Sequence, residues 1–527
     1  MMRESENNKL VKGALLLTLA GLISKLLSAG YRIPLQNLTG DMGFYVYQQV
    51  YPFLGIAMML ALYGFPAAIS KMTAEMEENG QGFSFKSFYI PVISLLSVMA
   101  VSIFLFLFFN AAYLAAWAGD SNLTSAYKLT SFIFLLLPFT ALMRGLLQGR
   151  QFMQPTAYSQ IGEQLIRVTL IITAAVWVYI NHAAVYIIGQ AAVAAAIIGG
   201  LAAIVILVFF FRRYKPAVSG NFTIPWEYYV RTLVILGTAA ALNHMVLIII
   251  QFADTFTLIP SLQEYGFTKT EAMKAKGVFD RGQPLVQLGT VVGSSFALAL
   301  IPAISAEKLR QHPVPLTHSI RSSLLFSFYL AAGATIGLII IFPETNRLLF
   351  LNENGTGPLR ILAMAVFLSS IGITTSSVLQ GLGYMKRTAL FVGVAFLVKW
   401  IANQVLVPFW GINGSAVATV VSLAVFALLT IMQLRRKLPS LSPRKHINWP
   451  AFVLAASGMT FFIAAADYFT GTIASRFGLL MYVMVTAVAG AIIYVTLLLR
   501  LKAFSEEELA MLPFAGLLIR IHKARDR

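Results

Sequence analysis

The most chemically informative residues of this chain are charges that interrupt apolar stretches. Lys25 and Arg32 lie seven residues apart in the first such stretch, so on an α-helix they share one face, two turns apart. A basic group at the centre of a membrane helix costs about 2.5–3.5 kcal/mol and therefore needs a partner or a wet cavity. Snorkelling to the interface explains Arg32 alone, but Lys25 lies too near the middle. The pair predicts a cationic helix face that borders an aqueous cavity.

Two basic residues in later stretches differ in their neighbours. Glu163 and Arg167 have the i,i+4 spacing of a helical ion pair, which suits a structural and a functional role equally. Lys399 has Ala395 where the matching acid would be. Its partner must come from another helix, from water or from a ligand.

Other ionisable residues lie near the ends of apolar stretches. Asp254 ends one stretch, and Asp280 with Arg281 opens the next, a position where adjacent unlike charges are more often solvated than functional. We expect His244 to satisfy a backbone or hydroxyl partner rather than to relay protons. The residues that we consider for a cavity or for ion coupling are Glu163, Arg167, Asp254, Asp280 and Lys399.

Motifs for metal or nucleotide chemistry are absent from the sequence. There is no cysteine, the six histidines form no cluster, and no Gly-x4-Gly-Lys-Ser/Thr segment occurs. We therefore expect no bound cofactor and no enzymatic activity. Transport, if it occurs, has to be driven by a Na⁺ or H⁺ gradient or by the membrane potential.

The charges belong to a chain whose composition is that of a membrane protein. Of 527 residues, 58% are hydrophobic and 11% are charged, which excludes soluble, fibrous and disordered classes. A membrane-spanning helix needs about 20 residues. The sequence predicts fourteen spans, at 11–35, 44–70, 87–112, 126–148, 156–180, 183–211, 229–254, 278–303, 318–342, 358–382, 388–408, 411–434, 450–467 and 477–500.

The basic residues predict the orientation of these spans. With the N-terminus in the cytoplasm, 27 of the 39 Lys and Arg residues lie in or near cytoplasmic loops, 8 lie in or near outer loops and 4 lie in the interior of spans. Both termini are therefore predicted to be cytoplasmic, and the net charge of +18 does not indicate nucleic-acid binding. Residues 505–522 predict a helix that rests on the cytoplasmic face.

The chain repeats itself at a spacing of 232 residues. Leu147-Gln148-Gly149 matches Leu379-Gln380-Gly381, Thr156-Ala157 matches Thr388-Ala389, and Arg167 matches Lys399. The offset is six spans, so the copies have the same orientation, as in the two lobes of an alternating-access transporter. We predict an all-α polytopic protein with two pseudo-symmetric six-helix lobes, at 1–215 and 216–440. Two further helices at 441–502 and a tail helix at 503–527 complete it.

Short motifs run through the first 71 residues. They are Lys12-Gly13, Ala20-Gly21-Leu22-Ile23-Ser24-Lys25, Tyr31-Arg32-Ile33-Pro34-Leu35, Gly40, Gly43, Tyr47-Gln48, Tyr51-Pro52 and Gly64-Phe65-Pro66-Ala67-Ala68-Ile69-Ser70-Lys71. This segment resembles the polysaccharide-biosynthesis and stage V sporulation protein B branch of bacterial flippases. That branch belongs, with the lipid II flippases, to the multidrug/oligosaccharidyl-lipid/polysaccharide exporter superfamily. The resemblance continues through the repeat to the last predicted span.

The resemblance implies a fold and a set of binding residues. Two lobes would surround a central cavity, and the last two helices would form a lipid-facing groove for a polyprenyl tail. Lys25, Arg32 and Arg281 would be the basic residues of the cavity, and Asp41 matches an acidic position of some lipid II flippases. Some relatives carry a further basic residue in the second helix, whereas this chain has none between positions 44 and 70.

The leading hypothesis is a flippase for an undecaprenyl-pyrophosphate-linked cell-wall precursor, such as lipid II, in the bacterial cytoplasmic membrane. Its partners would be the lipid-linked oligosaccharide, membrane lipids and cell-wall synthesis enzymes, with no nucleic acid, and the protein would be a monomer. The rival is a multidrug exporter coupled to Na⁺ or H⁺, which needs acids in the cavity for cationic drugs. A scaffold for cell-wall enzymes is disfavoured by the repeat and the interior charges.

Overall fold

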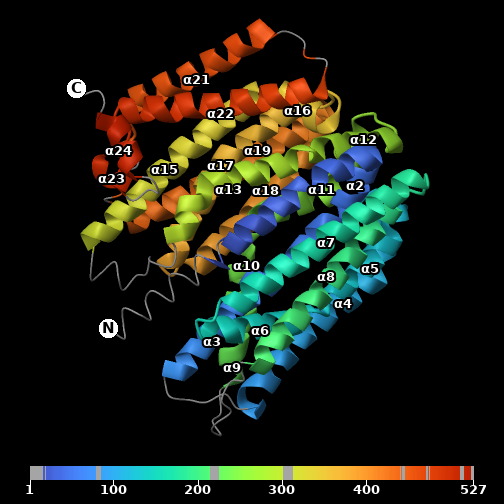
Figure 1. Cartoon of the computed structure of the whole chain (residues 1–527). Coiled ribbons are helices and arrows are strands. Elements are labelled where there is room, and N and C mark those ends of the chain that lie inside the picture. The colour runs from blue at the N-terminus through green and yellow to red at the C-terminus, as the bar shows by residue number, and fades with distance from the viewer. Residues whose placement is uncertain are drawn as a thin grey trace. The chain divides into compact units, whose positions relative to one another are not determined.

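The protein is described by a computed structural model (Figure 1). It covers residues 16–17, 19–78, 85–213, 225–300, 313–439, 441, 446–470, 473, 475–510 and 515–523. Every regular element in these residues is a helix, and none is a strand. The predicted all-α class is confirmed. The predicted chain ends, and with them the location of the termini, lie outside the described residues.

Twelve helical segments in the described part of the chain are long and apolar enough to cross a membrane. The first, Leu19–Glu78, has 60 residues. A straight helix of that size would be about 90 Å long, three times the hydrocarbon thickness of about 30 Å. It is interrupted at Gly40, whose φ of 67° and ψ of −174° are not helical. Two of the predicted spans therefore lie in this one segment, and the count of fourteen stays a prediction.

The chain divides into two compact units, which we describe separately. Unit one comprises Met1–Asp280 and Tyr384–Ala418. Its helices are the segment at 19–30, α2 (Arg32–Met59), η1 (Leu60–Gly64), α3 (Phe65–Glu78), η2 (Phe85–Tyr89), α4 (Ile90–Trp117), η3 (Ser121–Leu123), α5 (Thr124–Phe134), α6 (Leu137–Gly149), α7 (Gln154–Ile180), α8 (Ile187–Arg213), α9 (Trp226–Tyr229), η4 (Val230–Gly237), α10 (Thr238–His244), α11 (Val246–Glu264), α12 (Lys269–Asp280) and α18 (Met385–Trp410).

Unit two comprises Arg281–Gly383 and Thr419–Arg527. It contains α13 (Gly282–Leu300), α15 (Pro313–Ile340), α16 (Phe342–Phe350), α17 (Thr356–Gly381), α21 (Trp449–Thr470), α22 (Arg476–Arg500), α23 (Glu506–Ala510) and α24 (Ala515–Lys523). Helix α19 (Ile412–Lys437) begins in unit one and continues in unit two. The predicted lobes at 1–215 and 216–440 were drawn from the repeat, and their boundaries differ from those of the two units. The division into lobes stays a prediction.

Both copies of the repeat form two helices joined by a short turn. The first copy is α6 followed by α7, which packs beside α8 (Figure 1), and the second is α17 followed by α18. Proline occupies the first turn of α4, α6 and α7. It fits there because its fixed φ suits a helix and its missing N–H has no helical acceptor. These local signals account for the regular helix starts in unit one.

Helix α12 is held against α2 by a close backbone contact. It begins with a capping box, in which Thr268 and Glu271 exchange hydrogen bonds that lower the pKa of the Glu271 carboxyl group. One turn before its end, a Cβ at Gly277 would lie 2.1 Å from the carbonyl oxygen of Asp41. Only glycine permits this approach. The contact fixes the end of α12 beside the break in the first long segment.

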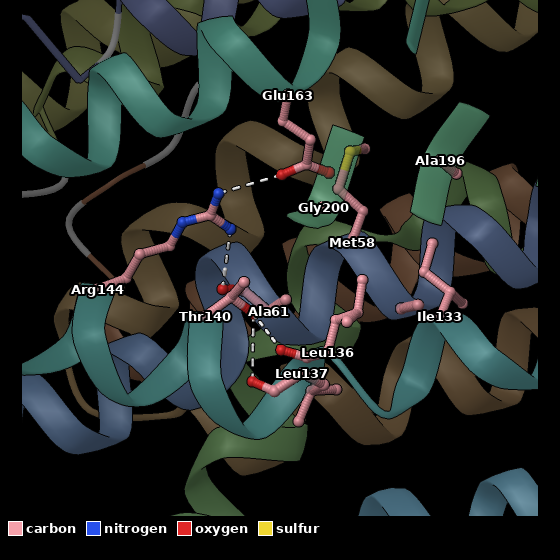
Figure 2. A pocket seen from close by; sticks show the side chains of 11 residues that line it. Met58, Ala61, Ile133, Leu136, Leu137, Thr140, Arg144, Glu163, Ala196 and Gly200 are labelled. Atoms are coloured by element: carbon pink, nitrogen blue, oxygen red, sulfur yellow. Dashed lines mark hydrogen bonds and ion pairs between the residues drawn. The ribbon is translucent and has the colours of Figure 1, made fainter. Parts of the chain in front are cut away.

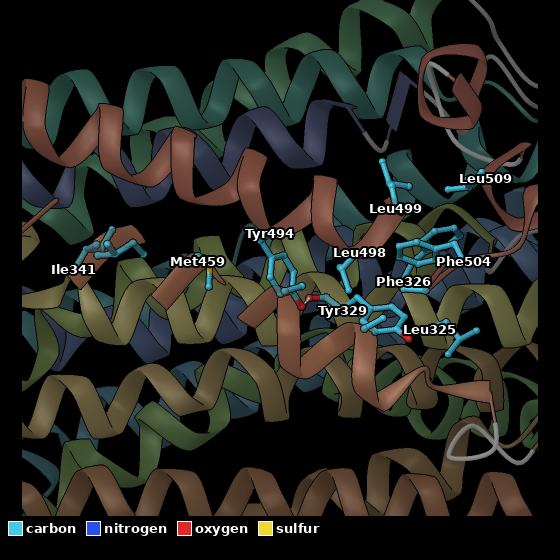
Figure 3. Packing of buried hydrophobic residues seen from close by; sticks show 14 residues of the cluster. Leu325, Phe326, Tyr329, Ile341, Met459, Tyr494, Leu498, Leu499, Phe504 and Leu509 are labelled. Carbon is cyan, nitrogen blue, oxygen red and sulfur yellow. Dashed lines mark hydrogen bonds between the residues drawn. The ribbon is translucent and has the colours of Figure 1, made fainter. Parts of the chain in front are cut away.

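Unit two contains a hydrophobic core between α15, α21 and α22 (Figure 3). The Tyr494 hydroxyl donates to the Tyr329 carbonyl oxygen at 2.9 Å, and the Tyr494 ring lies over Gly333. Phe326 stacks on Phe504 with ring centroids 5.0 Å apart. The faces of α21 and α22 toward α15 are thus filled by side chains, and the tail groove implied by the resemblance stays a prediction.

The predicted tail helix is present as two short helices, α23 and α24. Ser505 and Glu508 form the capping box that starts α23. Lys523 pairs with Glu506 at 2.9 Å, and His522 contacts the Leu499 carbonyl oxygen at 3.2 Å. Residues 511–514 between the two helices lie outside the described part.

Candidate functional site

Lys25 lies on the helix at 19–30 and its side chain is exposed. It is close enough to His244 of α10 for an electrostatic interaction. The His244 ring stacks on the Tyr63 ring at a centroid distance of 4.5 Å. This ring stack, rather than the predicted hydrogen bond, is the contact that the structure gives His244. The aqueous cavity expected beside Lys25 stays a prediction.

Arg32 is fully buried in this conformation, and the aqueous cavity expected beside it stays a prediction. Its guanidinium carbon lies 3.9 Å from the centre of the Tyr51 ring, and Nη2 donates to Ser28 Oγ at 3.3 Å. Nε and Nη1 have no hydrogen-bond partner. The rings of Tyr31 and Tyr47, whose hydroxyls bond each other, pack beside it. Stacking on an aromatic face stabilises the cation but satisfies none of these N–H groups.

Asp41 follows the break at Gly40 and is half-buried. Its carboxylate accepts a hydrogen bond from Gln36 Nε2 at 3.0 Å. The glycine of α12 lies against its backbone, as described above. Asp41 therefore lies at a well-packed corner of unit one.

Glu163 of α7 joins two arginines, of which Figure 2 shows Arg144. It accepts from Arg167 Nη2 at 2.5 Å, which confirms the predicted i,i+4 pair, and from Arg144 Nη2 of α6 at 3.1 Å. Arg144 also donates to the Ala61 carbonyl oxygen at 3.3 Å and to Ser159 Oγ at 3.2 Å. A cavity of about 20 Å³, large enough for one water molecule, borders Arg144 and Glu163. The cluster carries two positive charges and one negative charge.

Lys399 of α18 has its partner on another helix. Its Nζ lies 2.8 Å from Asp254 Oδ1 of α11 and also donates to the carbonyl oxygen and hydroxyl of Ser415 at 2.9 and 3.0 Å. Asn403 Nδ2 donates to the same Asp254 oxygen at 2.7 Å. Both charges are almost completely buried. The prediction that a span ends at Asp254 is wrong, because α11 continues to Glu264.

A second buried ion pair lies close to the first. Lys276 and Asp280 of α12 are 2.6 Å apart and are both buried, so the predicted solvation of Asp280 is also wrong. Asp280 interacts electrostatically with Asp254 and Lys399. The Phe279 ring lies 5.6 Å from Lys399 Nζ. These four charges form a buried cluster with no net charge, which we call the four-charge cluster.

Arg281 opens unit two and is also fully buried, against the prediction of a solvated site. Its Nη1 donates to Asn352 Oδ1 at 2.7 Å, and its guanidinium carbon lies 5.3 Å from the Phe350 ring centre. Arg32 and Arg281 thus share a pattern of a buried guanidinium next to an aromatic ring. Each is described within its own unit.

Four residues of these clusters were missed from the sequence. The charge count places Lys276 and Arg144 with the loop charges. However, the i,i+4 spacing relates Lys276 to Asp280, and Arg144 falls inside the predicted span 126–148. Asn403 and Ser415 carried no signal, because amides and hydroxyls are common in membrane helices. No group of three His, Asp or Glu residues in the described ranges could hold a metal ion.

The chain is similar to a known protein family and to membrane proteins of Bacillus subtilis. A family model described as polysaccharide biosynthesis protein matches residues 10–308, more than half of the chain. The chain belongs to this family. The uncharacterized membrane protein YabM of Bacillus subtilis (strain 168) is 36% identical over 522 residues, covering 98% of this chain and 97% of that protein. Stage V sporulation protein B of the same organism is 24% identical over 520 residues, covering 97% and 98%.

The fold has a counterpart among solved structures. A structure titled lipid II flippase MurJ, inward closed conformation, superposes with a TM-score of 0.67 at 14% identity, covering 92% of this chain and 99% of that chain. The resemblance read from the N-terminal motifs is therefore confirmed. This member of the polysaccharide biosynthesis protein family is a multi-span membrane protein with the fold of that flippase.

Proposed function

We propose that this protein flips an undecaprenyl-pyrophosphate-linked saccharide, lipid II or a related precursor, across the bacterial cytoplasmic membrane by alternating access. The observation that carries the proposal is Arg32, a fully buried guanidinium whose Nε and Nη1 atoms have no hydrogen-bond partner. A buried donor without an acceptor is costly, and a pyrophosphate supplies several anionic acceptors. Lys25 is the further cation of unit one that we assign to the head group.

The acids of the chain support an anionic substrate over a cationic drug. A multidrug exporter needs carboxylates that can pair with the drug. Glu163, Asp254 and Asp280, the three candidates for that role, are each paired with Arg or Lys in unit one. A cationic drug would have to displace a tethered cation from one of these pairs. The multidrug hypothesis therefore stays the second choice.

For the driving force we propose the membrane potential or a Na⁺ or H⁺ gradient, with the four-charge cluster as the place of coupling. Protonation of Asp254 or Asp280, or deprotonation of Lys399, changes the net charge of a cluster that is otherwise neutral. A buried charge change of this kind is large enough to shift a two-state equilibrium. Variants of Asp254 and Lys399 that still respond to an ion gradient as the wild type does would argue against this placement.

The proposed head-group site is tested by binding to purified protein. The probes are undecaprenyl pyrophosphate carrying N-acetylglucosamine, neutral undecaprenol and a cationic dye. Arg32→Gln is expected to weaken binding of the pyrophosphate lipid by about 10- to 100-fold, the effect of losing a hydrogen bond to a charged group. The control is Lys71→Gln, at a side chain that is 57% exposed, and it is expected to bind normally. Equal binding by the wild type and Arg32→Gln, or a wild-type preference for the dye, would refute the proposal.

A further inference from the structure

Helices α2, α4, α11 and α18 enclose an apolar pocket of about 410 Å³ within unit one. Seven aromatic rings and three leucines line it. Its size falls in the range of small-molecule pockets, about 300–1,000 Å³. With an apolar lining throughout, it suits a hydrocarbon ligand.

The pocket has a closed floor and an open rim. The floor includes Phe53 and Phe256, which are 5% and 4% exposed. The rim includes Phe106 and Leu397, which are 59% and 57% exposed and lie on the apolar outer faces of α4 and α18. Exposed apolar faces of membrane helices contact lipid. The mouth therefore opens toward the hydrocarbon of the bilayer.

The walls of the pocket are held in place by buried charges. Phe252 of α11 and Trp400 of α18 line it, and the same two helices are joined by the ion pair of Asp254 and Lys399. Trp117, at the end of α4, packs on Trp400 with ring centroids 5.5 Å apart. The pocket is thus preformed rather than dependent on a ligand for its shape.

We infer that this pocket holds the polyprenyl tail of the lipid-linked substrate. The inference rests on the proposed function. Helix α2 links the two sites, because Tyr51 stacks on Arg32 and Phe53, two residues later, lies in the pocket. The two side chains lie on different faces of a helix about 10–12 Å across, a distance that a polyprenyl chain easily spans. Its flat double bonds can stack on the aromatic rings, whereas saturated acyl chains offer no π face.

This tail site differs from the groove that the family resemblance implied. The implied groove would lie at the last two helices, whose faces toward α15 are filled by the core of unit two. The pocket is instead made by four helices of unit one. The lipid would be held by one unit at its pyrophosphate and at part of its tail.

Photo-crosslinking tests the inference with two neighbouring positions on α4. Leu107 lines the pocket and is 8% exposed, whereas Phe109, on the outer face, is 75% exposed. Leu107→p-benzoylphenylalanine and Phe109→p-benzoylphenylalanine are irradiated in native membranes, and mass spectrometry identifies the attached lipid. We expect polyprenyl adducts to be at least about tenfold enriched at position 107, with phospholipid adducts dominating at 109. The same phospholipid mixture at both positions would overturn the inference.

A second matched pair keeps the test informative if the first variant fails to fold. Leu114 lines the pocket at 6% exposure, and the neighbouring Tyr113 is 70% exposed. Added undecaprenol, which has the tail but no pyrophosphate, separates the two proposals. Crosslinking of undecaprenol at Leu114 without any binding of the pyrophosphate lipid would support the pocket and refute the proposed head-group site. Normal pyrophosphate binding with only phospholipid at Leu114 would refute the pocket alone.

Discussion

Lys399 and Asp254 should depend on each other in stabilising the protein, so that the effects of substituting them on the free energy of unfolding are not additive. Lys399→Met removes one charge and leaves a buried carboxylate whose remaining donors are Asn403 and Ser415. Breaking a buried pair from one side costs about 3–5 kcal/mol. Asp254→Asn should cost a similar amount, because it leaves a buried ammonium without its counter-ion. The double variant contains neither charge, so its destabilisation should be well below the sum of the two.

This double-mutant cycle is measured by chemical unfolding of the purified protein in detergent. The control is Lys71→Met, at the exposed i,i+4 pair with Glu75, where the distance is 3.6 Å and the side chains are 57% and 43% exposed. Exposed pairs contribute about 0–1 kcal/mol, so this variant should unfold like the wild type. Single-variant losses below about 1 kcal/mol, or strict additivity in the double variant, would refute the claim that the pair is buried and coupled.

Two further predictions use other contacts of unit one. Gly277→Ala should destabilise the protein by about 1–3 kcal/mol, because its Cβ would meet the Asp41 carbonyl oxygen, whereas Gly393→Ala, with nothing within 4 Å, should be neutral or slightly stabilising in the same unfolding assay. Equal effects at the two glycines would contradict the packing of α12. In this cysteine-free chain, Lys25→Cys should react with a membrane-impermeant thiol reagent, whereas Arg32→Cys should be protected in the conformation described here. Fast labelling at position 32 and none at position 25 would contradict the exposure of Lys25 and the burial of Arg32.

Local spacing predicted the parts of the site that lie on one helix. The pair of Glu163 and Arg167 follows from the helical repeat, and the same rule relates Lys276 to Asp280. The partner of Lys399 could not be found in this way. Asp254 lies 145 residues earlier in the chain, and only the packing of α11 against α18 brings the two together.

The error at Asp254 has a physical cause in α11. Hydropathy falls after residue 254 because Thr255, Thr257 and Ser261 follow, so the span was predicted to end there. These side chains are buried, and Thr257 donates to the Ala253 carbonyl oxygen at 2.8 Å. A hydroxyl that bonds the preceding turn is tolerated in a helix interior. The helix therefore continues past the point where the sequence becomes less apolar.

The predicted solvation of Asp280 and Arg281 is wrong because it treats two adjacent charges as one site. The two residues lie where α12 ends and α13 begins. Asp280 bonds back to Lys276 within its own helix, and Arg281 bonds to Asn352. A chain turn directs neighbouring side chains to different partners, and no spacing rule indicates which partners these are.

The central claim, that the protein moves an anionic lipid-linked saccharide, is tested most directly by leaflet exchange in proteoliposomes. Purified protein is reconstituted with a fluorescent undecaprenyl-pyrophosphoryl saccharide, and an impermeant quencher reports how much of it is in the outer leaflet. We predict complete exchange with the wild type and with Lys71→Gln, and exchange at the rate of protein-free vesicles with Arg32→Gln. Transport of a cationic dye without exchange of the lipid would contradict the account and favour a multidrug exporter.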